Sequence, residues 1–240
     1  MDARRRTSGQ GSGSSVIPPP YPRIPHLAVG RGTRDDLFLD AAAASDLLGS
    51  EVVVEEKLDG ANVVIWFDES DTVKCAPRGG PDAMDRAGQV GPLRAWLALH
   101  EMRLRSGLPW WPAVYAEWML LAHSVRYTAL PSYLVVLDLW DPNRGFAGVD
   151  ERDAWCEAAG LVSPPRLWTG APGSVAFVER LIGTSVWGSE AAEGVVVRRL
   201  DVGVPRMAKL LRADFRRLQD KSWRSRRPRN RLAEGEISFR

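Results

Sequence analysis

The stretch from Val52 to Phe67 constrains the fold more than any other part of this sequence. It reads VVVEEKLDGANVVIWF, so two runs rich in β-branched residues flank a Lys-Leu-Asp-Gly segment. Asp-Gly between two such runs is typical of a hairpin turn. The sequence therefore predicts an antiparallel hairpin with Lys57 near its turn. Two interpretations of Lys57 remain open: a solvated turn residue, or a lysine held for chemistry between two rigid elements.

Length and composition indicate one globular domain, with or without a small appendage. The 240 residues are 45% hydrophobic and include 10 tryptophans, which is enough to build a core. Cys75 and Cys156 are isolated, which fits a reducing compartment, and no Cys/His cluster has metal-ligand spacing. The sequence has no signal-peptide pattern and no run of about 18 apolar residues. We therefore expect a cytoplasmic protein without membrane contact.

The composition changes toward both ends of the chain. Residues 1–20 are rich in Arg, Ser, Gly and Pro, and we expect them to be disordered. Residues 206–240 contain 12 Arg or Lys against 4 Asp or Glu, which is a surplus of 8 positive charges. Because the whole chain has a formal net charge of +2, residues 1–205 carry a net charge of −6. We expect a domain over residues 21–215 and a basic tail over residues 216–240. The tail either contacts a nucleic-acid backbone or is a solvated basic end.

The apolar patterning predicts an α+β fold with mainly antiparallel sheets flanked by helices. Strands and helices do not alternate strictly, which argues against a doubly wound sheet. Helices are expected over residues 40–48, 92–105, 150–159 and 174–182. Further strands are expected over residues 72–76, 114–119, 133–140, 194–199 and 207–211. Asp150 is a candidate cap of the third helix, and Gly160 marks its end.

Several polar side chains interrupt apolar segments. Glu117 lies in VYAEWM, Glu193 opens EGVVVRR and Lys209 lies in MAKLL. Burying a charge is costly unless it is paired, so each is either salt-bridged or functional. Two interpretations of His123 are open: it acts as an acid or base, or it is a hydrogen-bonded packing residue. Trp223, among arginines and a lysine, either packs in a core or stacks on a base.

Five ordered segments resemble the motifs of small ATP-dependent RNA ligases, which belong to the covalent nucleotidyltransferase superfamily. They are Lys57–Gly60, Ala116–Trp118 with His123–Tyr127, Leu134–Asp141, Glu193–Arg198 and Ala208–Arg212. The resemblance runs from about Tyr21 to Phe215. It implies the nucleotidyltransferase fold of ligase adenylation domains, which is ATP-grasp-like. Only about 30 residues follow Lys209, too few for an additional OB-fold.

The resemblance implies an ATP-dependent RNA ligase. Such an enzyme forms a covalent lysyl-AMP, transfers AMP to an RNA 5′-phosphate, and lets a 3′-hydroxyl displace AMP to seal the strand. It uses ATP and Mg²⁺, with Mn²⁺ as an alternative ion, and it acts on RNA ends with or without a separate end-healing enzyme. The alternatives are a DNA nick ligase, another polynucleotide adenylyltransferase, or a non-catalytic RNA-binding protein of the same fold.

Residue roles follow from the same resemblance. The catalytic set comprises Lys57 as the nucleophile, Lys209 as the cation at the α-phosphate, and Glu193 as the ligand of the metal ion. The nucleotide-binding set is Glu56, Lys57, Asp59, Gly60, Asn62, Arg78, Glu117 and Lys209. Within it, Glu56 is expected at the adenine amino group and Glu117 at a ribose hydroxyl.

The nucleophilic lysine must be neutral to attack, although a free lysine has a pKa of about 10.4. We expect Lys209, Arg78 and a bound metal ion to lower the pKa of Lys57. Two positions depart from the family pattern. Ala116 stands where relatives usually carry glycine, and Met207 stands where they often carry a second lysine. Without that second lysine, the positive charge at the α-phosphate must come from Lys209 and the metal ion, or from Arg206.

Overall fold

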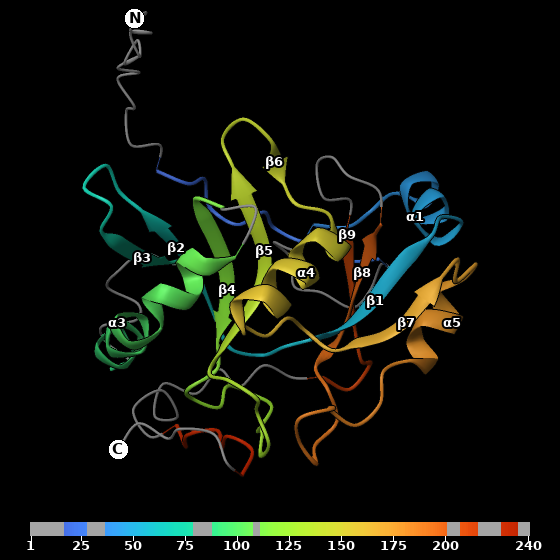
Figure 1. Ribbon diagram of the computed structural model, residues 1–240. Helices are drawn as coiled ribbons and strands as arrows, with labels where there is room; N and C mark the ends of the chain where they lie inside the picture. The colour runs from blue at the N-terminus through green and yellow to red at the C-terminus, as the bar shows by residue number, and fades with distance from the viewer. Residues whose placement is uncertain are drawn as a thin grey trace, which may run out of the picture.

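Two antiparallel sheets lie side by side in the computed structural model (Figure 1). The structure describes residues 17–27, 37–78, 88–107, 111–200, 207–215 and 227–234. The expectations for residues 1–16, Arg206, Trp223 and most of the basic tail lie outside the described residues. None of the helices in the described part of the chain is long and apolar enough to cross a membrane.

Each sheet carries its own helices. Sheet A has the strand order β7-β1-β8-β9, with β1 (Val52–Lys57), β7 (Arg166–Gly170), β8 (Gly194–Arg199) and β9 (Met207–Leu211). Sheet B has the order β3-β2-β4-β5-β6, with β2 (Ala61–Phe67), β3 (Val73–Pro77), β4 (Ala113–Trp118), β5 (Leu134–Asp141) and β6 (Gly145–Phe146). The helices are α1 (Ala41–Leu48), α3 (Val90–Ser106), α4 (Val149–Ala159) and α5 (Val175–Arg180). The predicted α+β fold with antiparallel sheets is confirmed.

Two apolar cores explain this arrangement. Leu47 and Leu48 of α1 and Val178 of α5 pack on β1 and β8 of sheet A. The larger core joins α3 and α4 to sheet B through Trp96 and Trp155. Each helix therefore buries one apolar stripe against one sheet, as the patterning predicts.

The predicted hairpin between residues 52 and 67 is wrong. The strand β1 pairs with β7 and β8, whereas β2 pairs with β3 and β4, so the two strands belong to different sheets. Leu58–Gly60 is a link that carries the chain from sheet A to sheet B. Side chains from β4 and the following loop hold this link, as described below, and these distant contacts override the local turn signal.

Other boundaries differ by a few residues from the expected ones. The strands β8 and β9 match their predicted ranges, and Gly160 ends α4 in the left-handed conformation with φ of 62°. The cap of α4 is Gly148 rather than Asp150. Asp150 instead forms an ion pair with Arg166 at 2.6 Å. The strand β7 was not predicted, because its short RLWTG sequence has no clear alternation of apolar and polar residues.

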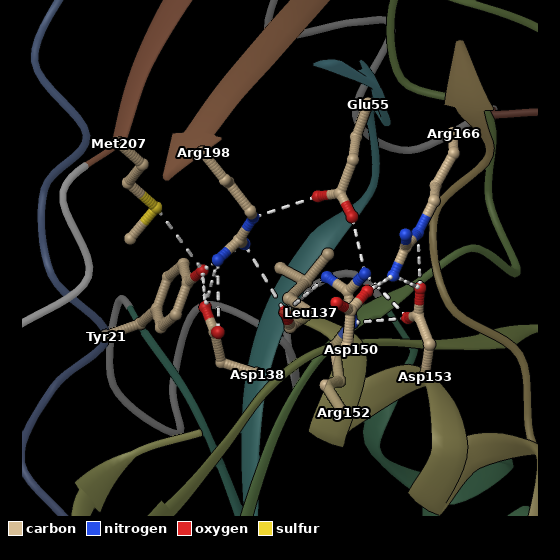
Figure 2. A network of polar contacts seen from close by, with 10 residues as sticks. All are labelled: Tyr21, Glu55, Leu137, Asp138, Asp150, Arg152, Asp153, Arg166, Arg198 and Met207. Carbon is tan, nitrogen blue, oxygen red and sulfur yellow. Dashed lines mark hydrogen bonds and ion pairs between the residues drawn. The ribbon is translucent and has the colours of Figure 1, made fainter. Parts of the chain in front are cut away.

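A buried network of charged groups connects the two sheets (Figure 2). Arg198 of β8 contacts Glu55 of β1 at 2.8 Å and Asp138 of β5 at 2.9 Å. Arg152 of α4 pairs with the other oxygen of Glu55. Tyr21 accepts a hydrogen bond from Arg198 at 2.9 Å and donates one to Asp138. Two buried arginines thus balance two buried carboxylates where the sheets meet.

We expect Arg198→Leu to lower the free energy of unfolding by about 3–5 kcal/mol, because it leaves two buried carboxylates without their shared cation. The neighbouring Arg199→Leu is the matched control. Arg199 pairs with Asp46, whose side chain is 56% exposed, so its loss should cost about 1 kcal/mol or less. Urea unfolding of both variants measures the difference, and equal destabilisation would contradict a special role for the network.

Candidate active site

Most of the residues predicted for the site line one cavity between the sheets. The cavity has a volume of about 590 Å³, which suits a nucleotide-sized ligand. The predicted residues in its lining are Glu56, Lys57, Gly60, Asn62, Arg78, Glu117 and Lys209. Glu193 is not in the lining but contacts Lys57. Asp59 lies in the link Leu58–Gly60, where it contacts Ser124. His123 does not line the cavity.

Lys57 is paired with a fully buried carboxylate. Its Nζ lies 2.6 Å from Oε2 of Glu193, whose side chain is 0% exposed. Burial opposes the charge on Lys57, but Glu193, Asp59 and Glu117 outweigh this effect and raise the pKa of the lysine. These carboxylates favour the ammonium form of Lys57, which differs from the expectation that nearby cations would lower its pKa. The difference arises because three carboxylates surround the lysine.

Glu117 and Asn62 face each other across two strands. They are directly paired residues of β4 and β2, and Asn62 Nδ2 lies 3.5 Å from Glu117 Oε2. The other oxygen, Oε1, accepts a hydrogen bond of 3.0 Å from the backbone N–H of Gly60. Burial raises the pKa of Glu117 to about 7, against the lowering effect of Lys57. The carboxyl group can therefore act as donor or acceptor near neutral pH.

The link between the sheets is held by hydrogen bonds to its backbone and side chain. Asp59 Oδ2 accepts from the backbone N–H groups of Ser124 at 2.5 Å and Val125 at 3.0 Å. The backbone N–H of Asp59 donates to Tyr127 Oη at 2.9 Å. Asp59 thus anchors the residues that follow Lys57. Its expected contact with nucleotide stays a prediction.

Gly60 permits the close approach of two strands. A Cβ atom at this position would lie 2.7 Å from Met119 Sδ and 2.8 Å from the carbonyl oxygen of Trp118. Only a residue without a side chain fits there. The Lys-Leu-Asp-Gly segment is therefore shaped by its contacts with residues 117–127, not by a tight hairpin turn.

Glu56 precedes Lys57 on β1 and lines the same cavity. Its Oε2 accepts a hydrogen bond of 2.8 Å from the backbone N–H of Val186. Its Oε1 is buried and has no hydrogen-bond partner among the described residues. Burial raises the pKa of this carboxyl group. A bound group with an N–H donor would satisfy the remaining oxygen.

Lys209 and Arg78 enter the cavity from opposite sheets. Lys209 lies in β9, whose edge is covered by the segment around His26, because Lys209 N donates to Pro25 O and Leu27 N donates to Lys209 O, both at 2.8 Å. Arg78 follows β3, and its backbone N–H donates to Asn62 O at 3.0 Å. Two cations therefore line the same cavity as Lys57.

Met207, at the position of the second family lysine, packs in an apolar cluster. It is 5% exposed and lies with Tyr21, Tyr115 and Val196. A charged side chain would be poorly accommodated there. Arg23, which sequence reasoning did not select, lines the cavity instead.

Comparison with known proteins identifies the group to which this protein belongs. The sequence matches the family described as RNA ligase over residues 50–211, more than half of the chain. The chain belongs to the RNA ligase family. No curated protein sequence matches it. The matched range contains Lys57, Glu117, Glu193 and Lys209.

Solved RNA ligase structures share the fold. An archaeal ATP-dependent RNA ligase superimposes with a TM-score of 0.52 at 22% identity, covering 85% of this chain and 50% of that one. A variant of the Naegleria gruberi RNA ligase with ATP and Mn gives a TM-score of 0.50 at 13% identity, covering 83% of this chain and 58% of that one. This RNA ligase family member thus spans about half the length of the solved relatives it resembles, and at these identities the likeness establishes the fold.

Several residues that shape the site were not among the predicted site residues. Tyr21, Arg23 and Arg198 line the cavity. Tyr127 contacts the link directly, and Asn230 holds the backbone of Tyr127. Arg198 was visible as a charge inside the VVVRR strand, the same signal that singled out Glu117. Asn230 gave no signal, since a lone asparagine between arginines is typical of a solvated tail.

We expect Gly60→Ala to destabilise the protein by about 1–3 kcal/mol, because the added methyl group meets Met119 and the backbone of Trp118. Gly91→Ala provides the control. Gly91 lies in α3 with no atom within 4 Å of an added Cβ, so alanine should be neutral or stabilising by about 0.4–1 kcal/mol. Urea unfolding of both variants tests this. Similar stabilities would show that the link can relax around a side chain.

Proposed function

We propose that this protein is an ATP-dependent RNA ligase that joins 3′-hydroxyl and 5′-phosphate RNA ends through a lysyl-AMP intermediate on Lys57. The observation that carries this proposal is the cavity itself. It brings Lys57 together with Glu56, Asn62, Arg78, Glu117 and Lys209, with Glu193 at 2.6 Å from Lys57 Nζ. Family membership and the ATP-containing structure of the Naegleria relative support the same conclusion.

The cavity matches the parts of a nucleotide. The unsatisfied oxygen of Glu56 fits the exocyclic amino group of adenine, because an unpaired buried acceptor costs about 1–3 kcal/mol. Glu117 can hydrogen-bond a ribose hydroxyl in either protonation state. Arg78 and Lys209 supply positive charge for the phosphates. These are the assignments that the sequence motifs imply.

The proposed reaction has three steps. The neutral amine of Lys57 attacks the α-phosphorus of ATP and loses one proton, and the P–N bond forms as pyrophosphate leaves with the electrons of the broken P–O bond. An oxygen of the RNA 5′-phosphate then attacks the same phosphorus and forms a 5′–5′ pyrophosphate bond to AMP, while the P–N bond breaks and the lysine nitrogen takes up a proton. Finally the RNA 3′-hydroxyl loses its proton and attacks the 5′-phosphorus. A phosphodiester forms and AMP leaves.

The residues also fit a divalent ion held mainly by substrate. No group of three or more His, Cys, Asp and Glu side chains in the described part of the chain forms a metal site. Mg²⁺ is commonly held by one or two carboxylates together with substrate phosphates and water, and Glu193 suits that pattern. A divalent ion held at Glu193 would supply positive charge that favours the neutral form of Lys57.

We expect wild-type protein with Mg²⁺ and labelled ATP to acquire one AMP, and Lys57→Ala to acquire none, because no other nucleophile takes its place. Lys74→Ala is the matched control and should be labelled fully, since Lys74 is an exposed residue of β3 that pairs with Asp68. Intact mass and peptide mapping locate the adduct. A wild-type protein that is neither adenylated as purified nor labelled by ATP would rule out this enzyme and favour a non-catalytic RNA-binding protein.

We further expect nicked RNA to be sealed faster than nicked DNA. The match to the RNA ligase family supports this preference, whereas the exposed Arg229 and Arg231 are candidates for contacts with the phosphates of either polymer. Paired assays with one duplex sequence in RNA and DNA versions, followed on denaturing gels, measure the ratio. Faster DNA sealing would support the DNA nick ligase alternative. The labelled lysine would be the same in both cases, so the two questions are answered separately.

A further inference from the structure

A segment far from Lys57 in sequence packs against the loop that supports the candidate active site. Residues 228–233, here called the strap, lie along the loop of residues 119–133, here called the clamp loop. Five backbone hydrogen bonds of 2.8–3.0 Å join them. They are Ala122 N to Pro228 O, Asn230 N to Leu120 O, Arg231 N to Tyr127 O, Leu130 N to Arg231 O, and Ala233 N to Leu130 O.

The side chain of Asn230 ties together two distant points of the clamp loop. Asn230 is 1% exposed, so its amide group must be satisfied within the protein. Its Nδ2 donates to Met119 O at 2.7 Å, and its Oδ1 accepts from Tyr127 N at 2.9 Å. One amide group therefore fixes the backbone at both residues.

Met119 and Tyr127, which Asn230 holds, both touch the link after Lys57, and Ser124 and Val125 of the same loop donate to Asp59. Tyr127 Oη accepts the hydrogen bond from Asp59 N at 2.9 Å. Met119 Sδ lies so close to Gly60 that a Cβ there would be 2.7 Å from it. Two chains of contact thus lead from Asn230, one through Tyr127 to Asp59 and one through Met119 to Gly60. They converge within three residues of the nucleophile.

We propose that Asn230 is a positioning residue for Lys57, and that the strap is therefore part of the active-site support. This inference rests on the proposed function, because it assigns to Asn230 an effect on lysyl-AMP formation. Asn230 is not among the residues that line the cavity, so any effect that it has on a nucleotide there is indirect. Its effect is geometric: it sets where the link leaves β1 and hence where Nζ of Lys57 stands relative to the α-phosphate.

The test is the rate of lysyl-AMP formation at saturating ATP. Asn230→Ala should lower this rate by about ten- to a hundredfold, since small displacements of a reacting group have effects of this size. The KM for ATP should change much less, because the residues that line the cavity are intact. Circular dichroism at the assay temperature establishes that the variant is folded. Glu234→Ala is the matched control, because it removes an exposed side chain directly after the strap and should react within twofold of wild type.

A second variant separates positioning from general loss of stability. Tyr127→Phe keeps the aromatic ring and the strap contacts but removes the acceptor for Asp59 N. It should slow the same step at unchanged KM. If Asn230 acts mainly through Tyr127, the double variant should be about as slow as the slower single variant, since residues on one path are not additive. This variant remains informative if Asn230→Ala does not fold.

Two results would overturn the proposal. One is a wild-type rate in folded Asn230→Ala or in Tyr127→Phe. The other is a loss of ATP affinity at an unchanged saturated rate. In either case wild-type protein would still become adenylated on Lys57, so the proposed function would stand. If wild-type protein were never adenylated, the proposed function itself would fail.

Discussion

The guanidinium group of Arg198, shared between Glu55 and Asp138, is the contact on which the active-site geometry depends. It joins β8 and β1 of sheet A to β5 of sheet B, and Arg152 completes the charge balance from α4. Desolvating four charges is costly, so the arrangement holds only while each charge keeps its partners. It therefore specifies one relative placement of the two sheets.

That placement decides where the side chain of Lys57 points. Glu55 and Lys57 lie two residues apart on β1, and alternate residues of a strand share a face. The network that holds Glu55 between the sheets thus also directs Lys57 into the cavity between them. Glu193 immediately precedes β8, the strand of Arg198, so the ion pair of Lys57 and Glu193 rests on the same two strands.

The sequence predicted most of the elements, and most of the predicted site residues line the cavity, because these depend on local patterns and on motif order. Glu117 and Lys209 stood out as charges within apolar strands, and both line the cavity. The pairing of strands could not be predicted in the same way. Asp-Gly indicates a hairpin locally, but Ser124, Val125 and Tyr127, all distant in sequence, hold the link in another shape. The position of the strap could not be predicted, because Asn230 forms its hydrogen bonds with residues that are distant in sequence.

The charges around Lys57 explain why nucleotide and cation should bind together. Glu193, Asp59 and Glu117 raise the pKa of the lysine. A triphosphate alone would add negative charge and favour the ammonium form still further. A divalent cation held at Glu193 would counter this effect, together with Arg78 and Lys209 in the cavity wall. Under the proposed function, Lys57 would therefore react only when both ligands are bound.

The strap contains two of the basic C-terminal residues. Arg229 and Arg231 are exposed, whereas Asn230 between them is buried, so side chains alternate between solvent and protein. An extended segment of this kind can support the clamp loop with one face and present cations with the other. Contact of RNA phosphates with the arginines would then occur on the same segment that supports the link after Lys57. Substrate binding and the placement of the nucleophile would share one structural element.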